Sequence, residues 1–176
     1  MMSVMGGPQR RLLETGVEPA WSPDGSKLAY HEIAPGDPMF VADRTGGNPK
    51  RIFAEQPDAH CHYMTWSKDG RFIYFARGLP LERMDIWRIA AAGGEPERIT
   101  HHNSQVDYPT VLDDRTLVYT AKGEDGSGPW LYGMDINNRI PQRLSLGVEQ
   151  YVSITASADG KRLVASVANP SGALWT

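Results

Sequence analysis

Two pairs of polar residues share a spacing that places side chains on one face of a strand. His60 and His62 flank Cys61, so on an extended strand both imidazoles point to one face and the thiol to the other. Gln105 and Asp107 follow 45 residues later with the same spacing. Imidazole and carboxylate groups are common metal ligands, and histidine carries protons near neutral pH. His60, His62 and Asp107 therefore predict a site for a divalent metal, Ca²⁺ or Zn²⁺, or for proton transfer.

The same residues also have a purely structural interpretation. If these strands line a central channel, that channel is polar and hydrated, and histidine and aspartate side chains in it hydrogen-bond to water and backbone groups. Cys61 fits a small buried thiol without reactivity. We therefore treat His60, His62, Gln105 and Asp107 as a candidate ligand-binding set, and the metal as one of two interpretations.

An internal repeat with a step of 45 residues indicates how these residues are positioned. Its copies begin at Trp21, Trp66, Val111 and Ala156. A second landmark, proline and arginine before an aliphatic residue, recurs at 49–52, 96–99 and 141–144. Each unit reads as four short strands, and four strands in about 40–45 residues is the period of a propeller blade. The sequence predicts an all-β chain, a β-propeller of four-stranded antiparallel blades, with about four blades' worth of strands.

An aspartate recurs in the turn between the first two strands of each unit. The aspartates expected to cap these turns are Asp24, Asp69, Asp114 and Asp159. Such a carboxylate accepts hydrogen bonds from its own turn. Calcium loops need several oxygen ligands in one short segment, and these turns offer one clear acid each, apart from the pair at 113–114. We expect a structural role for the four.

The repeat also divides the chain. We expect one domain over 1–176, made of a fourth strand within 6–16, blades at 17–60, 61–105 and 106–150, and a partial blade at 151–176. Residues 11–13 would form a lone fourth strand and residues 174–176 a lone third strand. Their pairing would close a ring within one chain, or join two chains as a homodimer, because open sheet edges invite pairing. The alternative is a fragment of a ring of about six to eight blades.

Charge and composition exclude several classes of protein. The chain has 18 Lys and Arg against 21 Asp and Glu, scattered along its length, which argues against a nucleic-acid partner. No apolar run approaches the roughly 18 residues that a membrane span needs, and the first residues lack the apolar core of a signal peptide. A cytoplasmic location is expected, or a periplasmic one if the chain is part of a larger exported protein.

The repeat resembles that of a known family. Trp-Ser-Pro-Asp-Gly at 21–25, an apolar strand, an aromatic strand and Gly-Gly-x-Pro-x-Arg-Ile-Thr at 93–100 are similar to the TolB-type, WD-like propeller repeat. Residues 125–132 and 147–151 look most like propeller modules attached to bacterial Ser/Thr kinases and transcription regulators. The third unit departs from the pattern at Val111 and Arg115. The resemblance implies a propeller and a sensing or scaffold role, and it carries over no kinase residues.

Two functions compete on this sequence. The first is a non-catalytic binding module that takes a protein, a peptide or a small molecule at the channel mouth, because loops on a rigid scaffold form binding sites. The second is a metal-dependent hydrolase of lactones or esters that uses His60, His62 and Asp107. Such an enzyme needs three protein ligands and an open coordination position. The sequence supplies candidates from only two units, so we favour the binding module.

Overall fold

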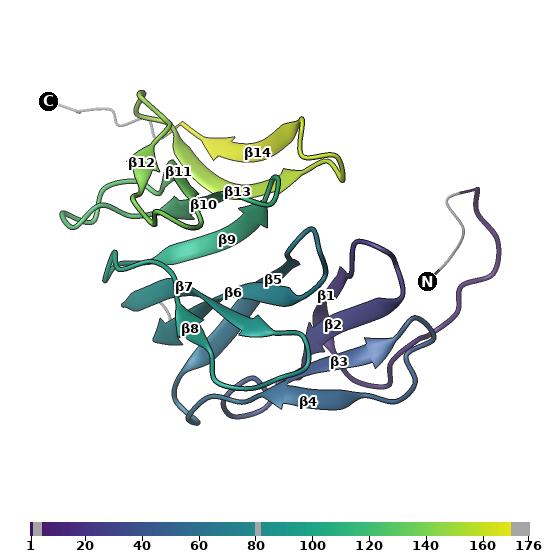
Figure 1. Cartoon of the computed structure of the whole chain (residues 1–176). Coiled ribbons are helices and arrows are strands. Elements are labelled where there is room, and N and C mark those ends of the chain that lie inside the picture. The colour runs from purple at the N-terminus through teal and green to yellow at the C-terminus, as the bar shows by residue number, and fades with distance from the viewer. Residues whose placement is uncertain (2–4, 80–81, 170–176) are drawn as a thin grey trace, which may run out of the picture.

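The structure, a computed structural model, describes residue 1, residues 5–79 and residues 82–169. The described residues form fourteen strands joined by turns and loops, and none of them is helical (Figure 1). Accordingly, this part of the chain has no helix long and apolar enough to cross a membrane. The predicted all-β architecture is confirmed.

The strands form four antiparallel sheets, each built from strands consecutive in the chain. The first sheet contains β1 (Val17–Trp21), β2 (Lys27–His31), β3 (Met39–Asp43) and β4 (Lys50–Phe53). The second contains β5 (His60–Trp66), β6 (Phe72–Leu79), β7 (Arg83–Ala90) and β8 (Glu97–Arg98). The third contains β9 (Val106–Val111), β10 (Thr116–Ala121), β11 (Trp130–Asp135) and β12 (Gln142–Arg143), and the fourth β13 (Gln150–Ala156) and β14 (Leu163–Ala168). We number these sheets as blades one to four.

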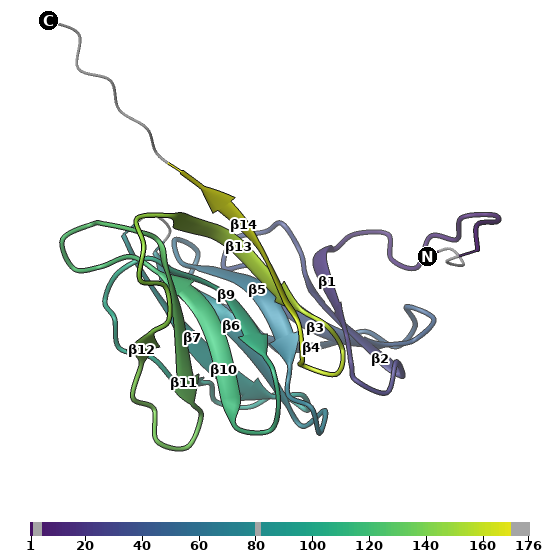
Figure 2. The ribbon, with the colours of Figure 1, turned by 90° about the horizontal axis from the view of Figure 1, so that it is seen from above.

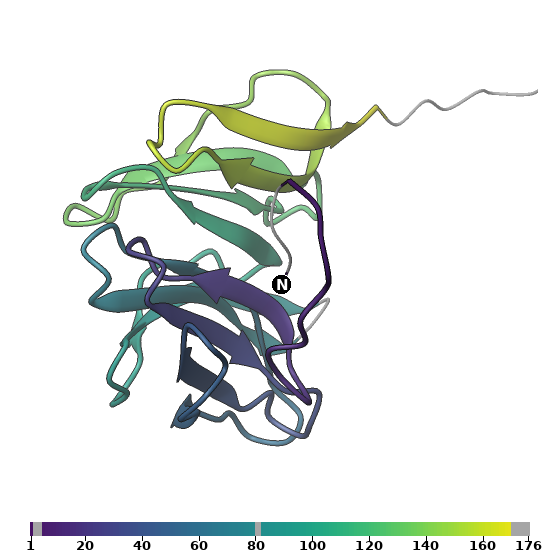
Figure 3. The same ribbon diagram turned by 90° about the vertical axis from the view of Figure 1, so that its right-hand side faces the viewer.

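The first strand of each blade lies beside the first strand of the next. β1 contacts β5, β5 contacts β9, and β9 contacts β13. Figure 2 shows β5, β9 and β13 side by side, and Figure 3 shows blade one and blade four at opposite ends of the stack. These four inner strands are therefore the elements that bring distant residues together.

Two apolar cores fill the spaces between the first three blades. Trp66 belongs to the core between blades one and two, where it is 5% exposed and its Nε1 donates a hydrogen bond to the Ala20 carbonyl at 2.9 Å. The second core, between blades two and three, includes Val111 at the position equivalent to Trp66. Trp21 occupies this position in blade one and is 42% exposed, because no described blade packs against that side.

Each of the first three inner strands has the same backbone irregularity. Glu18, Tyr63 and Tyr108 have φ angles of 49°, 58° and 54°. The register with the second strand of the blade shifts at each of these positions. A residue in the left-handed region within a strand forms a bulge and re-aims the side chains next to it. Simple alternation of faces therefore fails at this point of every inner strand.

The turn after each inner strand has the expected aspartate cap in three blades. Asp24, Asp69 and Asp159 each accept hydrogen bonds from a serine hydroxyl and from a backbone amide two residues ahead. In blade three the cap is Asp113, which accepts from the Arg115 and Thr116 amides, so the prediction for Asp114 was wrong.

The length of the turn explains this correction. Ser22 N bonds to Lys27 O across five residues, whereas Leu112 N bonds to Thr116 O across four. The turn of blade three is therefore one residue shorter, and it lacks the left-handed glycine found at Gly25 in blade one. The shortening moves the capping position back by one residue, from Asp114 to Asp113.

The predicted strand at residues 11–13 is not formed. Arg11 instead donates to the Leu13 and Glu14 carbonyls, and the Leu12 carbonyl lies against Gly46 in the turn after β3. Its expected partner, residues 174–176, lies outside the described residues. All six residues of β14 are exposed, and no described strand pairs with its outer edge. Pairing of open blade edges between two chains stays a prediction.

Candidate functional site

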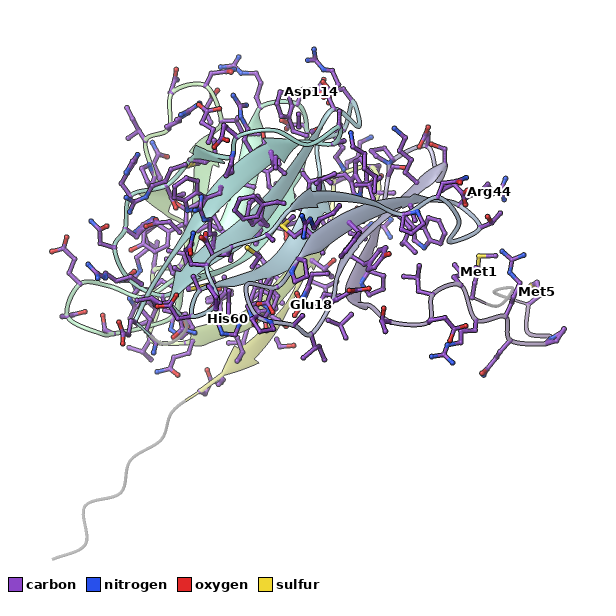
Figure 4. The ribbon with its side chains drawn as sticks, turned by 90° about the horizontal axis from the view of Figure 1, so that it is seen from below. Met1, Met5, Glu18, Arg44, His60 and Asp114 are labelled. Carbon is purple, nitrogen blue, oxygen red and sulfur yellow. The ribbon has the colours of Figure 1, made fainter. Side chains whose placement is uncertain are left out.

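Five titratable side chains lie where blades one and two meet, at the N-terminal ends of the inner strands. They are Glu18 of β1, His31 at the end of β2, Asp37 in the loop between β2 and β3, and His60 and His62 of β5. Because β1 and β2 are antiparallel, the last residue of β2 returns to the start of β1. We call this set the blade-junction cluster. Figure 4 shows Glu18 and His60 on the same side of the molecule, with Asp114 at the opposite side.

Glu18 connects the two blades. Its Oε2 accepts a hydrogen bond from the Tyr63 amide at 2.6 Å and lies 3.6 Å from Nε2 of His31. Its Oε1 lies 3.4 Å from Nδ1 of His62. Burial raises the pKa of this carboxyl, but the nearby imidazoles of His31 and His62 and the hydrogen bond from the Tyr63 amide outweigh burial and lower the pKa well below its usual range. Glu18 is therefore an anion throughout the physiological pH range.

Asp37 is the second acid of the cluster and is buried. Its Oδ2 lies 2.8 Å from Nδ1 of His60 and 3.7 Å from Nε2 of His62, and it accepts a hydrogen bond from the Cys61 amide. Its Oδ1 lies 4.0 Å from Nδ1 of His31. Asp37 thus faces all three histidines of the cluster.

The loop that carries Asp37 depends on a glycine. Gly36 has a φ of 78°, and its carbonyl accepts a hydrogen bond from the Glu55 amide at 2.8 Å. A Cβ at this position would come within 2.1 Å of the Glu55 carbonyl oxygen. Only glycine allows this close approach in a left-handed conformation. The contact holds the 32–38 loop against the segment before β5 and so places Asp37 beneath His60 and His62.

His62 lies between the two acids. Its contact with the Glu18 carboxylate raises the pKa of the imidazole, as do the charges of Asp37 and Asp107, while burial opposes them. The protonated ring is therefore stabilised, because each of its nitrogens faces a carboxylate. His62 therefore connects Glu18 and Asp37, the two acids of the cluster.

His31 is the most buried histidine of the cluster, 2% exposed. Its Nε2 is buried and has no hydrogen-bond partner. His31 pairs with Val17 of the inner strand, as Ala76 pairs with His62 and Thr120 pairs with Asp107. His31 is therefore the equivalent of Ala76 in blade two and of Thr120 in blade three. The blade fold does not need a polar ring here, since the other blades use a small side chain.

The structure brings together part of the predicted site. His60 and His62 belong to the cluster, as the spacing predicted. Gln105 instead donates from Nε2 to Oδ2 of Asp107 at 2.8 Å, and burial raises the pKa of Asp107. The two groups whose ligand atoms lie within 4.8 Å of one another are Glu18 with His31 and His62, and Asp37 with His60 and His62. Asp107 belongs to neither, although its charge acts on His62.

Sequence reasoning missed three members of the cluster. Period-two alternation does not predict the direction of Glu18, because the bulge at this residue turns its carboxylate toward His62. Asp37 lies in a loop, where no periodicity applies. The sequence alone could have indicated His31, because alignment of the units places this histidine at the position that Ala76 occupies in blade two.

Two further groups, Cys61 and His102, lie outside the cluster. Cys61 is fully buried in the core between blades one and two, and burial raises the pKa of its thiol. The prediction that the thiol is buried is confirmed, and its lack of reactivity stays a prediction. His102 lies in the loop between β8 and β9, where its Nε2 is 2.8 Å from the Tyr119 hydroxyl of blade three, and it belongs to neither group.

A groove of about 490 Å³ runs along the inner strands, and none of the five cluster residues lines it. Trp21, Tyr63, Tyr108 and Ile154 line it, so all four blades contribute. The Tyr63 ring packs against Tyr108 with 4.1 Å between centroids and an interplanar angle of 32°, and it lies 5.7 Å from the His62 ring. Tyr63 therefore joins the groove to the blade-junction cluster.

Comparison with known proteins supports the architecture. No protein-family model and no curated protein matches the chain. Among solved structures, TolB from Acinetobacter baumannii has a TM-score of 0.72 and 23% identity, over 89% of this chain and 38% of that chain. A nidogen/laminin complex matches at 0.64 and 18% identity, over 84% of this chain and 54% of that chain.

An oligogalacturonate lyase in complex with manganese is a further neighbour, with a TM-score of 0.55 and 19% identity, over 73% of this chain and 35% of that chain. The chain thus spans less than two thirds of each of these three proteins. Identities at this level show the fold alone. With its consecutive antiparallel blades and its inner strands side by side, the chain has the fold of a TolB-type β-propeller.

Proposed function

We propose that this chain is a non-catalytic binding module that takes a peptide segment of a protein partner in the groove along its inner strands. The observation that carries the proposal is the groove itself, to which all four blades contribute. Trp21 is 42% exposed along it, although large apolar side chains are normally buried. Tyr and Trp are the side chains most enriched where proteins bind proteins.

The polar end of the groove supports the same function. Of the predicted ligand-binding set of His60, His62, Gln105 and Asp107, none lines the groove, but the His62 ring lies 5.7 Å from the ring of Tyr63, which does. A small number of placed polar groups fixes the orientation of a ligand that apolar surface holds. A neighbour of known structure is a protein complex, nidogen with laminin, and propellers of this shape are therefore compatible with protein partners.

Peptide selection followed by nuclear magnetic resonance tests the proposal. A random heptapeptide library displayed on phage is selected on the purified chain, and an enriched peptide is titrated into ¹⁵N-labelled protein. We expect the indole N–H signal of Trp21 to shift, and that of Trp130 to stay unchanged because it lies on β11, outside the groove.

Matched variants complete this test. Trp21→Ala should weaken peptide binding by about tenfold or more, whereas Trp130→Ala should not. Enrichment of no peptide above the level of a blank surface would contradict the proposal. So would an enriched peptide that shifts Trp130 and leaves Trp21 in place.

A metal-dependent lactone or ester hydrolase is the second candidate, favoured by the two His-and-acid groups of the cluster. A dication with an open position polarises a carbonyl and activates water, which would break the ester C–O bond and release an acid and an alcohol. A screen of aromatic esters and simple lactones with zinc-loaded protein tests this candidate. Hydrolysis that depends on His62 would support it, and equal rates in wild type and His62→Ala would remove it.

A further inference from the structure

We propose that Glu18, His31 and His62 form a three-ligand site for a first-row transition-metal dication of the zinc class, with an open coordination position. The proposal shares His62 with the binding site of the proposed function but does not depend on peptide binding. Each residue offers one ligand atom, and these atoms all lie within 4.8 Å of one another.

The distances suit a metal better than direct hydrogen bonds. Glu18 Oε2 is 3.6 Å from His31 Nε2, and Glu18 Oε1 is 3.4 Å from His62 Nδ1. Both separations exceed the usual 2.7–3.2 Å of an N–H···O hydrogen bond. Ligand atoms at about 2 Å from a tetrahedral metal lie roughly 3.3 Å apart. The three ligand atoms here lie within 4.8 Å of one another, so the side chains would close in around a dication.

The buried nitrogen of His31 is the independent observation. Buried polar atoms in proteins nearly always have a partner, and Nε2 of this 2% exposed residue has none. Its equivalents, Ala76 and Thr120, show that the blade does not require a ring at this place. A metal–nitrogen bond would satisfy Nε2 and explain why a histidine occupies the position.

Asp37 supplies the outer support that such a site requires. It lies 3.7 Å from Nε2 of His62, the ring nitrogen that faces away from Glu18. The second nitrogen of His31, Nδ1, lies 3.4 Å from the Glu32 carbonyl oxygen and 4.0 Å from Asp37. Ligating histidines usually give their second nitrogen to a carboxylate, which sets the ring orientation. Asp37 also holds His60 at 2.8 Å, which makes His60 a partner of Asp37 rather than a ligand.

The donor set selects the class of metal. Calcium takes six to eight oxygen ligands, whereas this site offers two imidazoles and one carboxylate. Two histidines and one acidic residue, with a further position open, is a ligand set of catalytic zinc and of non-haem iron. The side chains of His62 and Glu18 are 27% and 33% exposed, so solvent can reach an open coordination position.

Titration of the purified chain with ZnCl₂ in a calorimeter and with CoCl₂ in a spectrophotometer tests the site. We expect one equivalent of metal per chain and visible Co²⁺ absorption bands of a low-coordinate site. His31→Ala and Glu18→Gln should each weaken zinc binding by about 100-fold or more. His60→Gln should weaken it by about tenfold at most, because His60 lies in the outer layer.

A control variant and a stability measurement exclude zinc binding by exposed histidines and loss of binding through unfolding. His101→Ala removes an exposed histidine outside the cluster and should bind zinc like wild type. Zinc should raise the melting temperature of wild type and of His101→Ala, because a ligand that binds only the folded state stabilises it, and it should not raise that of folded His31→Ala.

Two results would overturn the assignment. Wild-type affinity in His31→Ala, combined with loss of binding in His60→Gln, would place the metal on Asp37, His60 and His62 instead. Absence of zinc binding by wild type would remove the site altogether. Neither result would bear on peptide binding, which the Trp21 signal reports separately.

Discussion

The junction between blades one and two and the junction between blades two and three have the same backbone and different chemistry. Glu18, Tyr63 and Tyr108 share the left-handed conformation at equivalent positions. At the first junction Glu18 bonds to the Tyr63 amide and lies beside His62, whereas at the second the rings of Tyr63 and Tyr108 pack against each other. The first is ionic and leaves a buried nitrogen unpartnered, and the second is aromatic.

This difference shows how a repeat protein separates stability from function. The bulge of the inner strand is a property of the repeat and fixes where the side chain at this position points. Blade two uses the position for packing, and blade one uses it for charge. Side chains that depart from the pattern of their equivalents, such as His31 against Ala76, are therefore the ones to examine for function.

The largest expected difference is in the stability lost at Trp66 and at Trp21, which occupy equivalent positions in blades two and one. Trp66→Ala should reduce the free energy of unfolding by about 3–5 kcal/mol, because it empties a buried site between two blades. Trp21→Ala should cost less than about 1 kcal/mol, because this ring is 42% exposed. Urea unfolding measures both, and equal losses would contradict the described packing.

The carboxylate of the first junction should have the next largest effect. Glu18→Ala should cost about 1–2 kcal/mol, because it leaves the partly buried Tyr63 amide without its acceptor. Glu18→Gln keeps an acceptor oxygen and should cost less. If both variants unfold at the same urea concentration, the hydrogen bond to Tyr63 is not the source of the stabilisation.

The two partly or fully buried histidines offer a sharper contrast. His102→Ala should cost about 1–3 kcal/mol in metal-free protein, because it removes the partner of the buried Tyr119 hydroxyl. His31→Ala should change stability by less than about 1 kcal/mol, since the lost ring contacts are offset by removal of an unpartnered nitrogen. A larger loss in His31→Ala than in His102→Ala would assign His31 a structural role.

The smallest expected effect is the acid dependence of the turns. Hydrogen bonds from the Ser67 hydroxyl and the Arg71 amide lower the pKa of Asp69 to about 2. A lowered pKa means that this stabilisation is complete above the usual aspartate pKa of 3.8 and is lost as the pH falls toward 2.

Melting temperatures between pH 5 and pH 2 measure this effect. Asp69→Asn should flatten the decline of the melting temperature in the acid range. Asp114→Asn should melt like wild type at every pH, since none of the hydrogen bonds among the described residues involves Asp114. An equal change in both variants would contradict the assignment of Asp113 as the cap of blade three.

The architecture follows from local pattern. The step between Trp21 and Trp66, the capped turns and the aromatic third strands repeat in the sequence, and each depends on residues close in the chain. Tyr30 pairs with Phe40, Phe75 with Trp87 and Tyr119 with Tyr132, as the repeat indicates. The prediction of Asp114 was wrong because the turn of blade three is one residue shorter than that of blade one. The step between units is still 45 residues, so the step does not reveal the shortening.

The site was determined by the sequence only in part. The spacing of His60 and His62 placed both on one face of β5, and the structure agrees. Their acid partners came from tertiary structure, because the bulge at Glu18 breaks the alternation that sequence reasoning assumes, and because Asp37 reaches the histidines from a loop that Gly36 holds against Glu55. Periodicity reports the direction of a side chain within one strand, whereas the distance between side chains of two blades depends on how those blades pack.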